Sequence, residues 1–554
     1  MRFLFIHFIH NGGDMTKFFL PLLLALCFTA KAQENFNVEL IGSLDYDVLL
    51  SDVWGYVAED GTEYAIIGLF TGTAVISLED PANPTEVLFV PGAESIWRDM
   101  KTWGNYVYAV ADRGTDGLLV IDMSQAPESF NYHYWRPEIV INNNPQENLG
   151  RCHNMWIDEK GYAYLSGCRP QNNGGVLIFD LNEDPEFPPF VGAAAPIYSH
   201  DNFVRDDMMY SADIIDGFFS IHDVSDRTSP VLLATQNTTS TFTHNCWLSD
   251  DGIYLFTTDE RPEAYVDAYD VSDPSNIKYV NSFRPLTNKG EGVIPHNVHY
   301  HEGFLYVAWY TDGVIIVDAH KPDNMVKVGQ YDTFLGPHGD FNGHWGAYPF
   351  LPSGLLLSTD RQNGFFVFNP QHTRASYLEG RITSIETGLA VNNAKITIEA
   401  DIPNEASSTP DGIYKTGTAF PGTYEIRVTH PDFEDYVSQA DLLTGITTEY
   451  DIQLQPLGTN VEEADPIDLE QEVVIYPNPT SGHLTITFPQ HIANSFGPFR
   501  FSLFDITGKE IVQSSWFTTY LEIDLSYLPS GIYIGELVNS ASSIKLKEKV
   551  FIQN

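Results

Sequence analysis

A short apolar run followed by a polar residue and a turn recurs along the first two thirds of the chain. Each run ends in Asp, Asn or Ser, and successive runs end 43 to 58 residues apart. The seven instances are Val75-Ile76-Ser77, Val120-Ile121-Asp122, Ile178-Phe179-Asp180, Ile221-His222-Asp223, Ala268-Tyr269-Asp270, Ile316-Val317-Asp318 and Val367-Phe368-Asn369. This period suits a unit of four antiparallel strands. The pattern therefore predicts an all-β fold built around a seven-bladed β-propeller.

Turn residues support the same division into units. Four of the runs follow a dipeptide that favours a tight hairpin with positive φ. These dipeptides are Asp116-Gly117, Asp216-Gly217, Asp312-Gly313 and Asn363-Gly364. The last unit lacks an outer strand, because the chain leaves it after Asn369. Residues 37–45 resemble the missing strand, and we expect them to pair there and close the ring.

Composition narrows the range of partners and of compartments. The formal net charge is −45, and a surface this acidic repels phosphate backbones, so nucleic acid and anionic membranes are not expected as partners. Lys17, the apolar run Phe18–Phe28 and Ala30-Lys31-Ala32 predict a signal peptide over residues 1–32, with Met15 as an alternative start. We expect no transmembrane segment in the mature protein. Cys152 and Cys168 flank a predicted hairpin, so a disulfide between them is feasible after export.

Two of the repeats carry a resemblance to a known family. Leu119-Val120-Ile121-Asp122 and Val314-Ile315-Ile316-Val317-Asp318 are similar to LVIVD repeats. Residues 36–375 as a whole resemble the choice-of-anchor B propeller domain of exported bacterial proteins. Membership of a fold family does not assign an activity.

The rest of the chain predicts two small β-sandwich domains. Residues 378–456 resemble a carboxypeptidase regulatory-like domain, through Asp411-Gly412-Ile413-Tyr414 and Pro421-Gly422-Thr423-Tyr424. Residues 457–471 have the composition of an acidic linker. Residues 473–554 resemble a type A sorting domain of the type IX secretion system, through the segments 476–479, 504–509 and 528–533. That resemblance implies the secretion machinery as a partner, and a protein that is extracellular or anchored to the outer cell surface.

Histidines recur where the innermost strand of a blade should begin. They are His153, His200, His244, His296 and His344, and Asp52 and Trp97 stand in the same position of the other two blades. Innermost strands surround the channel of a propeller, so we expect five imidazoles and the Asp52 carboxylate to converge on one mouth. The second strands run back toward that mouth and should bring Arg113, Arg169, Arg361 and Asp259 close to it. Such a set could hold a divalent metal ion or an anionic group.

Duplication of one ancestral histidine would give the same pattern without any ligand, with the imidazoles holding turns between blades. Three functions therefore stay open. The first is a secreted or cell-surface binding or adhesion protein that grips a glycan or a protein. The second is a metal-dependent hydrolase or lyase with its site at the mouth. The third is a scaffold with purely structural histidines. No nucleophile elbow, phosphate loop or dinucleotide fingerprint assigns a reaction or an organic cofactor.

Overall fold

The chain forms two compact units, residues 1–457 and 458–554, which are described separately. The computed structural model describes residues 35–402, 404–457, 473–490, 498–539 and 545–553. The predicted signal peptide (1–32) lies outside the described residues, as does the predicted linker (457–471) apart from Leu457. No helix among the described residues is long and apolar enough to cross a membrane.

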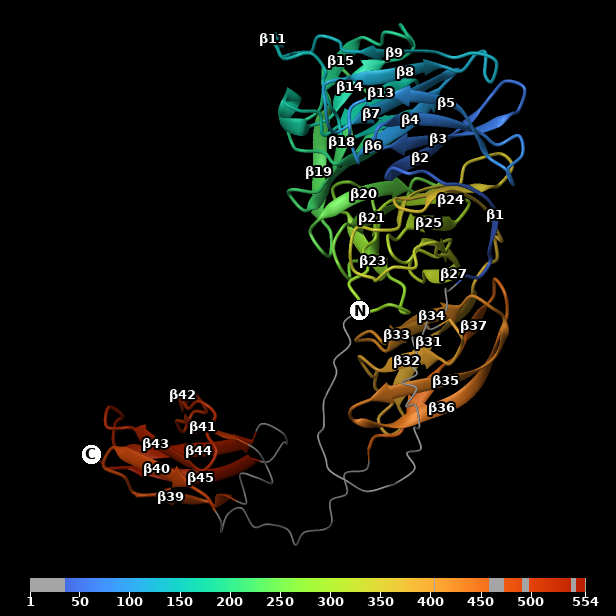
Figure 1. Ribbon diagram of the computed structural model, residues 1–554. Helices are drawn as coiled ribbons and strands as arrows, with labels where there is room; N and C mark the ends of the chain where they lie inside the picture. Colours follow the sequence, from blue (N-terminus) through green and yellow to red (C-terminus); the bar gives the residue numbers. More distant parts are fainter. Residues whose placement is uncertain (1–34, 403, 458–472, 491–497, 540–544, 554) are drawn as a thin grey trace, which may run out of the picture. The chain divides into compact units, whose positions relative to one another are not determined.

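A β-propeller makes up most of the first unit (Figure 1). Seven four-stranded antiparallel sheets follow one another over residues 38–370. From the innermost to the outermost strand they are β2 (Leu50–Val57), β3 (Glu63–Leu69), β4 (Gly72–Ser77) and β5 (Thr85–Pro91); β6 (Arg98–Trp103), β7 (Tyr106–Ala111), β8 (Leu118–Asp122) and β9 (Asn131–Trp135); β12 (Asn154–Ile157), β13 (Tyr162–Ser166), β14 (Leu177–Asp180) and β15 (Phe190–Ala193); β16 (Asp201–Arg205), β17 (Met208–Asp213), β18 (Phe218–Asp223) and β19 (Val231–Asn237); β20 (Thr243–Leu248), β21 (Tyr254–Asp259), β22 (Val266–Asp270) and β23 (Lys278–Phe283); β24 (Val298–His301), β25 (Phe304–Ala308), β26 (Val314–Asp318) and β27 (Val326–Tyr331); and β28 (His344–Tyr348), β29 (Leu356–Asp360), β30 (Gly364–Pro370) and β1 (Val38–Leu44). A short hairpin, β10 (Val140–Ile141) and β11 (Asn144–Pro145), and a 3-10 turn, η1 (Gln171–Gly174), lie in connections.

The ring closes through the first strand of the chain. β1 pairs antiparallel with β30, with Val38 opposite Pro370 and Leu44 opposite Phe365. The innermost strands of consecutive sheets contact one another, and β28 contacts β2 in turn. In Figure 1 the blue strand β1 accordingly lies among strands from much later in the chain. The prediction that residues 37–45 supply the missing outer strand is confirmed, and this pairing removes an open sheet edge.

In six of the seven repeated runs, the polar residue at the end accepts a local hydrogen bond where the third strand ends. Asp122 Oδ1 accepts one from the backbone N–H of Ser124 at 2.8 Å, and Asp223 does the same with Ser225 at 2.8 Å. This side-chain turn competes with strand continuation and so fixes where the strand ends. The apolar residues before it are fully buried, because each sheet is covered by a neighbour on both faces.

A β-bulge in the innermost strands decides which side chains reach the channel. In β20, Thr243 pairs with Asp259 and Asn245 pairs with Thr258, which leaves His244 as an extra residue. In β28, His344 pairs with Asp360 and Gly346 pairs with Thr359, so the extra residue there is Trp345. His344 is therefore equivalent to Thr243 and not to His244. A shift of one residue along a strand turns a side chain to the opposite face.

A β-sandwich completes the first unit. Its sheets are β34 (Ile413–Thr418), β31 (Ser376–Ser384) and β37 (Thr447–Glu449), with β38 (Ile452–Leu454) also on β31, and β33 (Asn404–Ser407), β32 (Lys395–Ile398), β35 (Gly422–His430) and β36 (Phe433–Leu442). Buried apolar residues of both sheets share one core. The sandwich is tied to the propeller by polar contacts, for example from Asn324 Nδ2 to the carbonyl oxygen of Thr416 at 3.1 Å.

The second unit contains two sheets packed face to face. They are β39 (Val474–Tyr476), β40 (His483–Thr487) and β43 (Tyr520–Asp524), and β42 (Glu510–Gln513), β41 (Phe499–Phe504), β44 (Gly531–Asn539) and β45 (Lys545–Ile552). Leu484 and Ile486 of the first sheet share a core with Phe501 and Leu503 of the second.

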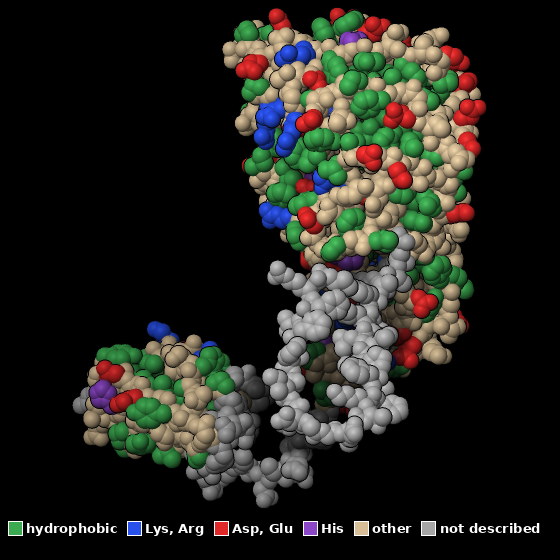
Figure 2. Space-filling model, viewed as in Figure 1, with side chains coloured by type: hydrophobic (Ala, Val, Ile, Leu, Met, Phe, Trp, Pro, Cys, Tyr) green, Lys and Arg blue, Asp and Glu red, His purple; other side chains and the backbone are tan. Residues whose placement is uncertain are grey.

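Acidic side chains are spread singly over the viewed face of the propeller and do not form one patch (Figure 2). This distribution is typical of a solvated surface.

Candidate functional site

Four histidine rings lie in a row at one mouth of the propeller channel. The four residues are His153, His200, His244 and His296, and they come from four consecutive blades. Each lies at or just before the first paired residues of the innermost strand of its blade. Their ring centroids are 3.9, 4.2 and 4.3 Å apart in that order. The expected convergence of imidazoles therefore holds for these four residues.

His344 does not join this row. It is completely buried within its own blade, where Nδ1 lies 2.7 Å from Ser358 Oγ and Nε2 lies 2.8 Å from Thr333 Oγ1. The bulge places Trp345 at the mouth instead, with its ring 4.5 Å from that of His296. The prediction that His344 is equivalent to the other four histidines is therefore wrong by one residue.

The Nδ1 atoms of three of the four imidazoles are held by oxygen atoms. His153 Nδ1 lies 3.0 Å from Asp112 Oδ2, and His200 Nδ1 lies 2.8 Å from Asp201 Oδ1. His296 Nδ1 lies 2.6 Å from the carbonyl oxygen of Trp345. A carboxylate or carbonyl on one ring nitrogen fixes the tautomer and leaves Nε2 as the electron-pair donor. No described residue makes a hydrogen bond to Nε2 of these three rings.

Glu260 is the carboxylate closest to the free nitrogens. Its Oε2 lies 3.9 Å from His244 Nε2, and its Oε1 lies 3.9 Å from His296 Nε2. The Tyr310 hydroxyl donates a hydrogen bond of 2.6 Å to Oε1. Burial raises the pKa of Glu260 to about 7, although the hydrogen bond from Tyr310 lowers it in part. Burial also lowers the pKa of His296 to about 3 and that of His244 well below its usual value, so both rings are neutral at pH 7.

Asp259, which the sequence predicts near the mouth, directly precedes Glu260. Asp259 accepts hydrogen bonds from Thr238 Oγ1 and from the backbone N–H groups of Ser240 and Phe242, which fix a loop away from the cavity. The signal for Glu260 is positional: it directly follows the second strand of its blade, as Asp112 and Arg361 do in theirs.

A small cavity of about 20 Å³ lies beside the four histidines, and Glu260 is not among the residues that line it. A volume of this size holds one water molecule or one ion. Its lining comprises Asp52, Trp97, Arg98, Asp99, His153, Asn154, His200, Asp201, His244, His296, Asn297 and Trp345. Asp52 also lines the cavity, where its Oδ2 accepts a hydrogen bond of 3.2 Å from Asn297 Nδ2. Two groups of possible metal ligands result, His153 with His200 and Asp201, and His244 with Glu260 and His296.

Four aromatic side chains, Trp54, Trp156, Trp247 and Phe350, contact one another in a closed circle. The centroids of Trp54 and Trp156 are 6.0 Å apart, those of Trp156 and Trp247 4.9 Å, those of Trp247 and Phe350 5.3 Å, and those of Phe350 and Trp54 6.3 Å. Lys101 lies over Trp54 and forms a buried ion pair of 2.6 Å with Asp99. The cavity is therefore backed by a packed aromatic layer.

The three arginines expected at the mouth do not line the cavity. Arg113 stacks on Trp97 at 5.1 Å and Arg169 on Tyr198 at 4.5 Å, and both are exposed. Arg361 is largely buried and stacks on Trp345 at 4.9 Å. Arg113 and Arg361 thus contact Trp97 and Trp345, which line the cavity, whereas Arg169 contacts Tyr198, which does not. A role of the three arginines in ligand binding stays a prediction. A disulfide joins Cys152, which directly precedes His153, to Cys168, and the Cα atoms of the two cysteines are 4.0 Å apart.

Two segments of the chain match known protein families. Residues 97–128 and 296–333 match the LVIVD repeat, and residues 474–553 match the secretion system C-terminal sorting domain. The protein is therefore exported by the type IX secretion system to the cell surface or the extracellular space. No curated protein matches the chain.

The solved structures that are similar to this chain include three of low identity. The Cps50 (Swd1) β-propeller domain of Myceliophteria thermophila is 10% identical, with a TM-score of 0.42 over 60% of this chain and 99% of that one. Raptor of Chaetomium thermophilum is 11% identical, with a TM-score of 0.44 over 61% and 30%. A putative 6-phosphogluconolactonase of Bacteroides fragilis is 14% identical, with a TM-score of 0.42 over 62% and 94%.

Proposed function

We propose that this exported propeller protein binds a divalent transition-metal ion at its mouth, through Nε2 of His244, Nε2 of His296 and the carboxylate of Glu260. The observation that carries the proposal is the contact of two buried imidazoles with one carboxylate: Nε2 of His244 and Nε2 of His296 each lie 3.9 Å from an oxygen of Glu260. Nδ1 of His296 is held by the carbonyl oxygen of Trp345, whereas Nδ1 of His244 makes no hydrogen bond to a described residue. Neutral imidazole and carboxylate are ligands that suit zinc and its neighbours in the first transition row.

Distances favour this group of ligands. Two ligand atoms on one tetrahedral zinc ion lie about 3.4 Å apart, since each bond is close to 2 Å. The two contacts between Glu260 and the histidines, at 3.9 Å, need to shorten by only about half an ångström. The alternative group contains Asp201, whose two oxygens are already engaged by His200 and by Asn245 Nδ2. Glu260 is the freer carboxylate.

Three protein ligands leave an open coordination position, which an extracellular protein or glycan would fill. We propose this ligand binding or adhesion as the biological role. The cavity volume of about 20 Å³ suits an ion and is too small for an organic substrate. It therefore does not favour the alternative of a hydrolase or a lyase with its site at the mouth.

We further propose that the seven sheets are the blades of a choice-of-anchor B propeller spanning residues 36–375. The sandwich at 378–456 is then a carboxypeptidase regulatory-like spacer, and the C-terminal unit is the part that contacts the secretion machinery. The modular order of propeller, spacer and sorting domain supports a protein that presents a binding surface outside the cell.

Metal analysis of the purified protein tests the proposed site. The wild type, the double variant His244→Ala with His296→Ala, and the control His372→Gln are each stripped with a chelator and dialysed against Zn²⁺, Ni²⁺ or Co²⁺. We expect one tightly held ion in the wild type and the control, and none in the double variant. A wild type that retains no ion from any of these solutions contradicts the proposal and favours structural histidines.

A further inference from the structure

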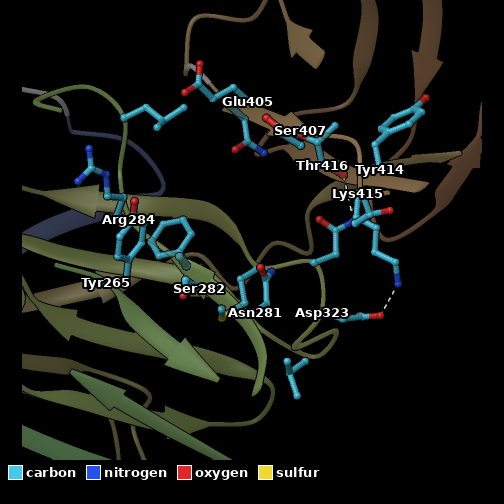
Figure 3. Close-up of a pocket in the computed structure, with 18 of the residues that line it drawn as sticks. Tyr265, Asn281, Ser282, Arg284, Asp323, Glu405, Ser407, Tyr414, Lys415 and Thr416 are labelled. Carbon is cyan, nitrogen blue, oxygen red and sulfur yellow. Dashed lines mark hydrogen bonds and ion pairs between the residues drawn. The ribbon is translucent and has the colours of Figure 1, made fainter. Parts of the chain in front are cut away.

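A second hollow lies where the propeller meets the sandwich, far along the chain from the histidine row. Its volume is about 490 Å³, and it is lined by the outer strand β23 and its following loop on one side and by β33 and β34 on the other (Figure 3). Pockets for small ligands have volumes of about 300–1,000 Å³. The hollow is thus large enough for an organic ligand, unlike the cavity at the mouth.

The charged side chains around this pocket are all paired. Lys415 contacts Asp323, and Figure 3 shows its amine directed at that carboxylate. Lys289 Nζ lies 2.9 Å from Glu405 Oε1, and Arg284 Nη1 lies 2.9 Å from a carboxylate oxygen of Glu263. Each cation already has an anion, so the pocket offers no free charge to an ionic ligand.

Several neutral polar groups in the pocket have no partner. The hydroxyls of Tyr265, Ser407 and Thr416 and the amide of Asn281 make no side-chain hydrogen bond to any described residue, and all four residues are labelled around the pocket in Figure 3. Of these four groups, only the Thr416 hydroxyl is buried; Tyr265 and Asn281 are partly exposed and Ser407 is exposed, so the polar groups of these three residues are accessible to a ligand. Accessible hydroxyl and amide groups can exchange hydrogen bonds with water for hydrogen bonds with a ligand.

Apolar surface accompanies these groups. Val280, Phe283 and Met325 line the same hollow, and the Tyr265 ring carries the Arg284 guanidinium at 5.2 Å from its centroid. Hydroxyls and an amide beside aromatic and aliphatic surface match a sugar, which has hydroxyl groups at its edges and C–H groups on its faces.

We infer that this pocket binds an uncharged oligosaccharide of two or three residues. The site uses Tyr265 and Asn281 from the propeller and Ser407 from the sandwich, so it needs both domains. The inference is independent of the metal at the mouth, because none of these residues lines that cavity.

Saturation-transfer NMR with the full-length protein tests the inference. The probes are maltotriose, cellotriose, laminaritriose, xylotriose and chitotriose, with a sulfated chondroitin disaccharide as the charged comparison. We expect at least one neutral trisaccharide to bind, and Asn281→Ala and Ser407→Ala each to weaken binding about tenfold, the effect of one lost hydrogen bond. Asn131→Ala, which removes an exposed amide from the outer strand β9, should leave binding unchanged.

Chelator treatment separates this site from the mouth, since binding at the junction should survive metal removal. The inference fails if no neutral trisaccharide binds, if the charged disaccharide binds more tightly than all of them, or if both pocket variants bind as the wild type does. Thermal unfolding of each variant checks that it is folded, and Tyr265→Phe, which removes only a hydroxyl, provides a milder second variant.

Discussion

The hydroxyl of Tyr310 donates a hydrogen bond of 2.6 Å to Glu260 Oε1, while Oε2 of the same carboxylate faces His244. One oxygen is thus positioned by a buried tyrosine, and the other is left for a cation. Groups that orient a metal ligand in this way contribute to affinity without touching the ion.

Replacing Tyr310 by Phe should weaken metal binding by about 10- to 100-fold, the usual effect of removing a group that orients a ligand. Competition against a chelating dye measures the change. Tyr164→Phe is the matched control, because its hydroxyl also donates to a buried carboxylate, Asp158, at 2.9 Å, and Asp158 belongs to neither group of possible metal ligands. Equal affinities for Tyr310→Phe and the control would show that Glu260 needs no such support.

His344 allows a structural histidine to be compared with the histidines that we propose bind a metal. Its two hydrogen bonds, to Ser358 and Thr333, are buried, so His344→Ala should lower the free energy of unfolding by about 2–4 kcal/mol. The metal content should stay at the wild-type value. Urea unfolding followed by tryptophan fluorescence measures the first quantity and elemental analysis the second. Loss of the ion in this variant would place His344 among the ligands.

The sequence was sufficient to predict the circle of seven sheets, because the patterns that mark each sheet are local in the chain. A polar residue caps the third strand in six of the seven blades, and apolar residues buried on both faces recur in all of them. The first strand of the chain pairs with the last sheet. The row of four histidines follows from that repetition. Each of them lies at the start of an innermost strand, as the alignment of the repeats predicts.

What the sequence could not supply was register. Either His344 or Trp345 could be the extra residue of the bulge, and only the pairing of Gly346 with Thr359 decides between them. A similar choice arises at the end of β21, where Asp259 and Glu260 are adjacent carboxylates. Asp259 is bound to backbone N–H groups of a loop, and Glu260 is the one that faces the histidines. Tyr310 was missed because its role depends on Glu260.

The disulfide should contribute substantially to stability. Cys152 and Cys168 are separated by 16 residues in the sequence, and a closed loop of this length stabilises a fold by about 3 kcal/mol. Guanidinium unfolding with and without a reductant should therefore show a fall of that order in the wild type. In the double variant Cys152→Ala with Cys168→Ala, the reductant should have no effect. A response in that variant would point to Cys246, the remaining buried thiol.

Asp213 should make the protein less stable as the pH rises toward neutrality. It is buried and accepts hydrogen bonds from Ser211 and Ser220, and burial raises its pKa to about 7, from about 3.9 in an unfolded chain. Between these two pKa values the folded state binds more protons than the unfolded state. The free energy of unfolding therefore falls as the pH rises from about 4 to about 7, by at most about 4 kcal/mol for this group.

Asp213→Asn removes the titration and keeps a polar side chain that can bond both serines. We expect the difference in unfolding free energy between pH 5 and pH 8 to be smaller in this variant than in the wild type. Asp435→Asn, an exposed change in the sandwich, should retain the wild-type difference. Urea unfolding at the two pH values gives the comparison. An unchanged difference in Asp213→Asn would mean that Asp213 is already ionised in the folded protein at pH 5.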